Sequence, residues 1–188
     1  MNSFPLSMNL KGRRVAIAGG GTEALRKARL FVSAGADVVL VAAEIEQEAK
    51  EELSNAASLI EATPAPADFK GSVLAVIADA EESVAARYAK WARQAGALVN
   101  VVDQPALCDF TTPSIIDRGD IVIGISTGGA APVLGQQLRG RIEAMAPARL
   151  GDLAAFAKSF RSAVKATIAP AERRMFWKRV FNGPVAAR

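Results

Sequence analysis

Two glycine clusters and one aspartate are the residues of this 188-residue chain whose types and positions could support chemistry. Residues 19–21 are three consecutive glycines that follow an apolar run and precede a helix-like run. Asp103 ends a second apolar run, and the glycine pair 128–129 follows a third. The chain contains no histidine, which excludes histidine-based triads and histidine-containing zinc sites. A general base must therefore be a carboxylate, a lysine or a tyrosine.

The first glycine cluster fits a dinucleotide-binding pattern. Gly19, Gly21 and Ala24 match G-x-G-x-x-G/A, in which the first glycine turns tightly, the second lets backbone approach a pyrophosphate, and the small third residue lets helix meet strand. Free N–H groups at the helix start then bind the phosphates. A structural turn without a ligand is the alternative. Asp37 comes too early and Glu44 slightly late for the usual ribose-binding acid, so the residues leave the choice between NAD and NADP open.

Strand-like and helix-like segments alternate along the first 103 residues. This alternation predicts an α/β fold with a Rossmann-type parallel sheet and helices on both faces. The expected strands are 13–18, 36–43, 59–63, 72–79 and 97–103, and the expected helices are 22–35, 45–58 and 81–96.

The pattern changes after Asp103. Residues 104–114 have two prolines and no periodicity, which indicates a loop, and residues 120–127 form the next expected strand. A helix is expected to begin at Pro132, because proline is favoured in a first helical turn. Helices are also expected at 150–168 and 170–181. We therefore expect a nucleotide-binding sheet over 1–112, a connecting unit over 113–147 and a helical tail over 148–188.

The charge distribution and the composition indicate which partners and which cellular compartment to expect. Residues 113–188 carry 12 basic and 5 acidic residues, whereas residues 1–112 carry 11 basic and 14 acidic. The basic end suits a polyanionic partner, or it is simply a basic surface. No apolar run reaches the roughly 18 residues needed to span a bilayer, and no secretory signal is visible. The single cysteine, Cys108, agrees with a reducing compartment, so we expect a cytoplasmic protein.

The order of motifs resembles the precorrin-2 dehydrogenase family, which includes the amino-terminal module of siroheme synthase. The resemblance implies that the chain binds NAD on a Rossmann domain at 1–112, forms a homodimer through a middle segment at 113–147 and ends in a small helical domain at 148–188. It also implies oxidation of precorrin-2 to sirohydrochlorin, an activity that some members combine with ferrous-iron insertion. The motifs that carry it are residues 19–30, "NVVD" at 100–103, "PSIIDR" at 113–118, "STGGAAPVL" at 126–134 and "ERRMFW" at 172–177.

The resemblance also implies which residues act. The functional aspartate of the family falls on Asp103, and a serine near the substrate, phosphorylated in some members, falls on Thr127. The family's cofactor contacts fall on Thr22, Glu23, Ala42 and Ala43, beside the glycines of the loop.

The residues themselves support roles for Asp103 and for the second glycine cluster. Asp103 ends a strand at the carboxyl edge of the sheet, where open parallel sheets bind ligands, and a carboxylate can take a proton while nicotinamide takes a hydride. Its alternative role is to cap the following loop. Ser126, Thr127 and Gly128 form either a substrate-binding loop or a plain turn. Asn100 is the remaining candidate for binding the substrate. Its alternative role is to tie neighbouring loops together.

Two further classes of function remain open at this point. The first is a non-catalytic nucleotide-sensing Rossmann module with a basic, partner-binding tail. The second is a dehydrogenase of the same architecture with another substrate. We expect no nucleic-acid partner, no membrane partner and no permanent metal site, because a tetrapyrrole supplies its own nitrogen ligands to iron. Chelatase activity stays open.

Overall fold

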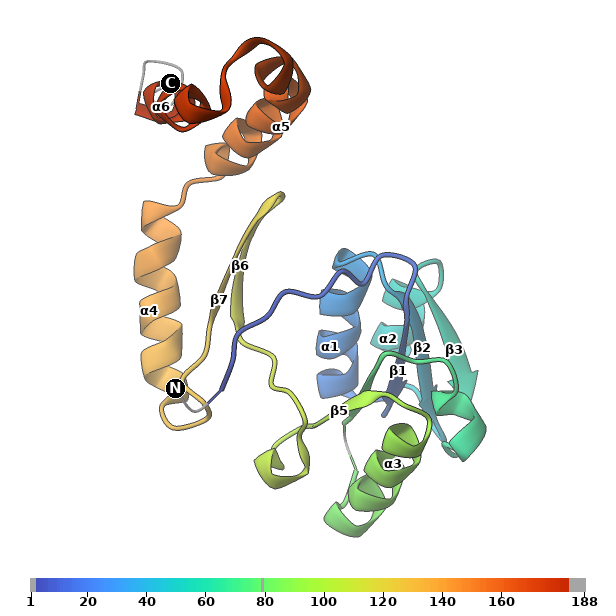
Figure 1. Ribbon diagram of the computed structural model, residues 1–188. Coiled ribbons are helices and arrows are strands. Elements are labelled where there is room, and N and C mark those ends of the chain that lie inside the picture. The colour runs from blue at the N-terminus through green and yellow to red at the C-terminus, as the bar shows by residue number, and fades with distance from the viewer. Residues whose placement is uncertain (1–2, 79, 183–188) are drawn as a thin grey trace. The chain divides into compact units, whose positions relative to one another are not determined.

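The computed structural model describes residues 3–78 and 80–182, which form two compact units divided between Thr112 and Pro113. Asp79, the last residue of the fourth predicted strand, lies outside the described residues. Figure 1 shows the elements in chain order. The first unit contains β1 (Arg14–Ala18), α1 (Thr22–Ser33), β2 (Asp37–Ala42), α2 (Gln47–Leu53), β3 (Ala57–Glu61), η1 (Pro66–Phe69), β4 (Leu74–Ile77), α3 (Glu82–Gln94), β5 (Leu98–Val101) and η2 (Pro105–Leu107).

The first unit is a five-stranded sheet in the order β3-β2-β1-β4-β5, with every neighbouring pair parallel. The chain builds one half outward from β1 and then crosses to β4 on the other side. All strands therefore end at one edge, and a crevice is expected beside β1, where the strand order reverses. This topology confirms the predicted Rossmann-type sheet.

Alternating side chains of the strands form a core on each face of the sheet. Val15 and Ile17 of β1 pack on the face that α1 and α2 cover. Ala16 and Ala18 pack on the opposite face, with α3. α3 presents a stripe of small, fully buried residues, Ala85, Ala89 and Ala92. Because these alanines are small, the helix can pack closely against β4 and β5.

Several predicted elements differ in their boundaries from those observed; the strand predicted over 97–103, for example, ends at Val101. The helix predicted over 45–58 ends at Leu53, because residues 57–61 pair with β2 and become β3. Sheet pairing thus overrides the helical preference of a short polar segment. The loop predicted over 104–114 contains the 3-10 helix η2 and ends in a strand that the sequence analysis did not predict.

That strand, β6 (Ser114–Arg118), opens the second unit. It pairs antiparallel with β7 (Ile121–Ile125) around a turn in which Gly119 has a φ of 68°. Three helices follow, namely α4 (Pro132–Met145), α5 (Arg149–Thr167) and α6 (Pro170–Asn182). No helix in the described part of the chain is both long and apolar enough to cross a membrane.

Two arginines attach α4 to the hairpin within the second unit. Arg118 Nε donates to the Ala146 carbonyl (2.8 Å), and Arg139 Nε donates to the Ile115 carbonyl (3.0 Å). Both guanidinium groups also pair with Glu143. These cations of the basic end therefore stabilise the unit itself.

Candidate functional site

A cavity of about 580 Å³ opens at the carboxyl edge of the sheet in the first unit. This volume lies within the usual range for ligand sites. The lining comes from residues 18–21 after β1, residues 42–44 and Glu46 after β2, residues 63–64 after β3, and Ala78, Ala80, Glu81, Val84 and Tyr88 from the β4–α3 connection and α3. The cavity therefore occupies the crevice that the strand order predicts.

The glycine loop fits a dinucleotide because side chains are sterically excluded from it. Gly19 has a φ of 145°, and a Cβ there would collide with the Ala78 carbonyl oxygen. A Cβ on Gly20 would collide with the Glu44 carbonyl oxygen. Gly21 is the N-cap of α1, so the backbone N–H groups of the first helical turn begin where a phosphate would sit.

The cofactor residues predicted from the sequence fall into two groups. Gly19, Gly21, Ala42 and Ala43 line the cavity, whereas Thr22 and Glu23 lie in the first turn of α1 outside its lining. The Glu23 carboxylate is bound by the Arg26 guanidinium, with Nη2 to Oε2 at 2.6 Å. This hydrogen bond lowers the pKa of Glu23, against a smaller opposing effect of desolvation.

Three carboxylates of the lining were not predicted as site residues. They belong to Glu44, Glu46 and Glu81, and no lysine or arginine is among the lining residues. Glu44 lies two residues beyond the end of β2, slightly later than the usual ribose-binding acid. The backbone of this loop is fixed, because the Glu46 N–H donates to the Gly20 carbonyl (2.9 Å). Asp37 begins β2, at the other end of the strand.

Asp103 follows β5 by two residues and has an unusual backbone conformation. Its φ is 58°, and among the described residues it is the one non-glycine residue with a positive φ. Its side chain is exposed and, within the described chain, makes no hydrogen bond or ion pair. A loop-capping role would require such a bond. The hydrogen bond to Glu23 is the main reason why the pKa of Arg26 is raised, and the charge of Asp103 adds a smaller effect in the same direction. Burial lowers the pKa of Lys27, and the charge of Asp103 opposes this only weakly.

Asn100 and the second glycine cluster make contacts within their own units. Asn100 is 6% exposed, and its Nδ2 donates to the Phe110 carbonyl (3.0 Å), which ties the following loop to β5. In the turn between β7 and α4, the Ser126 hydroxyl accepts from the Gly128 N–H (3.2 Å). The Thr127 hydroxyl accepts from the Ala131 N–H (3.4 Å). The described residues contain no cluster of acidic or cysteine side chains that could hold a metal ion.

Lys27 is a buried cation on α1 that the sequence analysis did not single out. It is 6% exposed, and its ammonium donates to the Thr112 hydroxyl (3.1 Å). No carboxylate within the described chain forms an ion pair with it. Burial lowers the pKa of Lys27, and the neighbouring Arg26 lowers it further. A buried charge that has no opposite charge beside it destabilises the folded state.

We expect Lys27→Met to increase the free energy of unfolding by about 1 kcal/mol near neutral pH. The folded-state pKa lies below the ordinary value of 10.5, so the unfolded chain binds more protons in the window between the two values. The contribution of Lys27 to stability therefore rises with pH through that window, and the methionine variant lacks this rise. Urea unfolding at about pH 7 and about pH 10 measures both effects.

The exposed Lys90 of α3 provides the matched control, as Lys90→Met. A loss of stability in Lys27→Met larger than in this control would show that the ammonium has a stabilising partner.

Three family models match the chain. An NAD(P)-binding family matches residues 6–114, the sirohaem biosynthesis protein central region matches residues 118–145, and the sirohaem synthase dimerisation region matches residues 149–188. These matches confirm the resemblance that the order of motifs indicates.

Curated relatives and a solved structure agree with these matches. The siroheme synthase of Stutzerimonas stutzeri (strain A1501) is 46% identical over 188 residues, which are 99% of this chain and 40% of that protein. That of Azotobacter vinelandii (strain DJ) is 43% identical over 190 residues, 100% of this chain and 41% of that protein. The chain thus spans about two fifths of these relatives. The precorrin-2 dehydrogenase SirC has the same fold, with a TM-score of 0.75 at 22% identity over 95% of this chain and 89% of that chain.

Proposed function

Because the chain belongs to the NAD(P)-binding family matched over residues 6–114, we propose that it oxidises precorrin-2 to sirohydrochlorin with NAD as the acceptor. One observation carries the proposal. A cavity lined by the glycine loop and an aspartate without a partner in the described chain follow strands of the same sheet, which all end at one edge. The two sirohaem-specific regions that follow this sheet indicate a tetrapyrrole substrate.

The reaction removes two electrons and two protons from the macrocycle. NAD, when bound, takes up one hydrogen as a hydride together with both electrons. The Asp103 carboxylate accepts the remaining proton as general base. The backbone N–H groups in the first turn of α1 would hold the pyrophosphate of a bound dinucleotide. A carboxylate base fits a chain that contains no histidine.

The second unit contains the other residues predicted to bind the substrate. Ser126, Thr127 and Gly128 lie in a turn whose two glycines have positive φ values of 62° and 82°, which leaves backbone available for close approach to a ligand. Basic side chains of residues 113–188 suit the carboxylates of a tetrapyrrole. Arg118 and Arg139 are already engaged with Glu143, so Arg141 and Arg149 are the better candidates.

The test is an anaerobic assay with precorrin-2 and NAD. We expect the sirohydrochlorin absorption spectrum to develop together with equimolar NADH. Binding of NAD without turnover would reject the enzyme in favour of the nucleotide-sensing module with a basic, partner-binding tail. If the protein reduces NAD with another substrate but not with precorrin-2, precorrin-2 is rejected as the substrate. Ferrous or cobaltous ion added to sirohydrochlorin tests chelatase activity separately.

We expect the protein to bind NAD about 100-fold more tightly than NADP. The 2′-phosphate of NADP would enter a lining with three carboxylates and no cation, and like charges brought together cost several kcal/mol. The Glu44 carboxylate can instead accept hydrogen bonds from the ribose of NAD. Glu44→Gln should reduce the ratio of the NAD affinity to the NADP affinity about tenfold. Isothermal titration calorimetry with both dinucleotides measures it.

Glu51→Gln is the control for Glu44→Gln, because Glu51 lies on the exposed side of α2 and bonds Gln47. An equal preference for NAD and NADP in the wild-type protein would contradict the electrostatic explanation.

We infer that the protein is a homodimer, with residues 113–147 as the predicted interface. Within this segment Val122, Val133, Leu134 and Met145 are 51–81% exposed, and large exposed apolar side chains are typical of interaction surfaces. The dimerisation region of the family model covers residues 149–188 instead, where Phe156 and Phe160 are also exposed. Light scattering of Val133→Glu and of Phe160→Glu would show which segment holds the two copies together.

A further inference from the structure

The strand that leads to Asp103 has one side without a neighbouring strand. β5 is the last strand in the sheet order. On its inner side the Leu98 N–H donates to the Val73 carbonyl (3.1 Å) and the Val102 N–H to the Ile77 carbonyl (2.9 Å). The N–H and carbonyl groups of Val99 therefore point to the outer side, where an edge strand normally needs protection.

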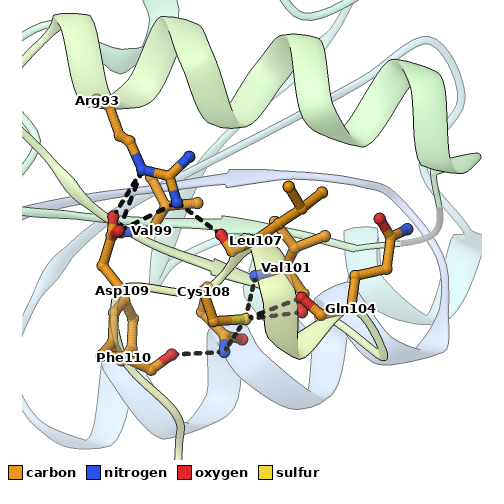
Figure 2. Close-up of polar contacts among 9 residues, drawn as sticks. Arg93, Val99, Val101, Gln104, Leu107, Cys108, Asp109 and Phe110 are labelled. Carbon is orange, nitrogen blue, oxygen red and sulfur yellow. Dashed lines mark hydrogen bonds and ion pairs between the residues drawn. The ribbon is translucent and has the colours of Figure 1, made fainter.

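The segment after Asp103 folds back and binds the outer groups. The Val99 N–H donates to Asp109 Oδ2 (3.0 Å), and the Val99 carbonyl accepts from the Asp109 N–H (2.7 Å). The Val101 N–H donates to the Cys108 sulfur (3.2 Å), and the Val101 carbonyl accepts from the Gln104 N–H (3.3 Å). Figure 2 shows these contacts side by side. Side chains and backbone N–H groups of this segment thus take the place of a missing strand.

Arg93, in the last turn of α3, fastens the returning segment to the helix. Its Nε lies 3.1 and 3.0 Å from the two carboxylate oxygens of Asp109, and its Nη2 donates to the Leu107 carbonyl (2.7 Å). A guanidinium that holds a carboxylate with several parallel hydrogen bonds fixes direction as well as distance. Asp109 consequently joins α3, β5 and the loop at one carboxylate.

Asp103 lies inside the turn that these contacts close. A non-glycine residue in the left-handed region costs about 1–3 kcal/mol and persists where its surroundings over-determine it. Before Asp103, the Val102 N–H donates to the Ile77 carbonyl of β4. After Asp103, the Asp109 carboxylate accepts from the Val99 N–H of β5. These two hydrogen bonds hold the turn on both sides of Asp103. We propose that Arg93 and Asp109 are positioning residues that keep Asp103 left-handed and so set the direction of its carboxylate.

This inference rests on the proposed function, in which Asp103 is the general base. The competing explanation is that the Arg93–Asp109 pair only protects the edge of the sheet. The two explanations differ in their effect on turnover. A misdirected base reduces kcat, because displacements of about 1 Å can cost up to 10²-fold, whereas edge protection alone changes only stability and amide exchange.

The experiment compares Arg93→Leu and Asp109→Asn with Lys90→Leu, an exposed change one turn earlier on α3. We expect each positioning variant to reduce kcat about tenfold with an unchanged KM for NAD. Amide hydrogen exchange at Val99 and Val101 should become about tenfold faster. Wild-type kcat in both variants, with or without faster exchange, would overturn the proposal.

A double-mutant cycle separates a positioning role from a general loss of structure. If Arg93 acts through Asp103, Arg93→Leu causes no further loss of kcat in an Asp103→Asn background. Losses that multiply would overturn the proposal in favour of a structural role. Failure of the proposed function is distinguishable, because Asp103→Asn alone would then keep wild-type kcat.

Discussion

We expect Asp103→Asn to reduce the kcat of precorrin-2 oxidation by about 10²- to 10⁴-fold, the usual contribution of a general base. Asparagine has the shape of aspartate and tolerates the left-handed region, so the φ of 58° can be kept while the proton acceptor is lost. The affinity for NAD should change by no more than about twofold, because Asp103 does not line the dinucleotide cavity. Single-turnover formation of NADH under anaerobic conditions measures the rate.

Two controls make this result specific to Asp103. Asp37→Asn changes an exposed aspartate at the opposite edge of the sheet and should leave kcat unchanged. Asp103→Ala removes the same carboxylate but also adds the cost of a left-handed alanine, roughly 1–2 kcal/mol. It should therefore be less stable than Asp103→Asn with no further loss of kcat. Wild-type turnover in Asp103→Asn would remove Asp103 as the base.

The first unit could be predicted from the sequence because its central strands are apolar on both faces. Buried parallel strands have continuous apolar sequences such as Val38–Val41, and these alternate with helices at regular spacing. Once that sheet is predicted, the residues that follow its strands must gather at one edge. The glycine loop and Asp103 could be placed there without coordinates, because position in the topology decides their location.

Other features depend on contacts between segments that are distant in sequence. β6 contains a buried Ile116 followed by charged Asp117 and Arg118, so its strand character comes from pairing with β7 rather than from its own pattern. The position of Glu44 in the cavity lining likewise had no signal of its own in the sequence, because it depends on the path of the loop after β2. The left-handed conformation of Asp103 was also not predicted from the sequence; it occurs in the turn that the Gln104 N–H closes on the Val101 carbonyl.

The three consecutive glycines also illustrate this difference. The motif assigns roles to Gly19 and Gly21 and leaves the middle position free. In the structure Gly20 is the glycine whose missing side chain matters most sterically, because the Glu44 carbonyl and the Ala42 side chain occupy the space of a Cβ. The constraint comes from β2 and its following loop, which a local motif does not include.

Gly20→Ala should therefore weaken NAD binding about 100-fold. The added Cβ would overlap the Glu44 carbonyl oxygen and approach the Ala42 Cβ to 2.9 Å, and neither can withdraw freely. Ala42 belongs to β2, and the Glu46 N–H is bonded to the Gly20 carbonyl. Overpacking of this kind costs up to about 3 kcal/mol, which corresponds to roughly 100-fold in affinity. Calorimetric titration with NAD measures the loss.

Gly140→Ala on α4 is the matched control, since a Cβ there meets no atom within 4 Å. It should leave NAD binding unchanged and increase stability by about 0.5–1 kcal/mol, because alanine favours a helix interior over glycine. A thermal scan shows whether Gly20→Ala remains folded. If folded Gly20→Ala binds NAD as tightly as the wild-type protein, the loop after β2 is free to move, and the glycine loop is then not the rigid cradle on which the dehydrogenase proposal depends.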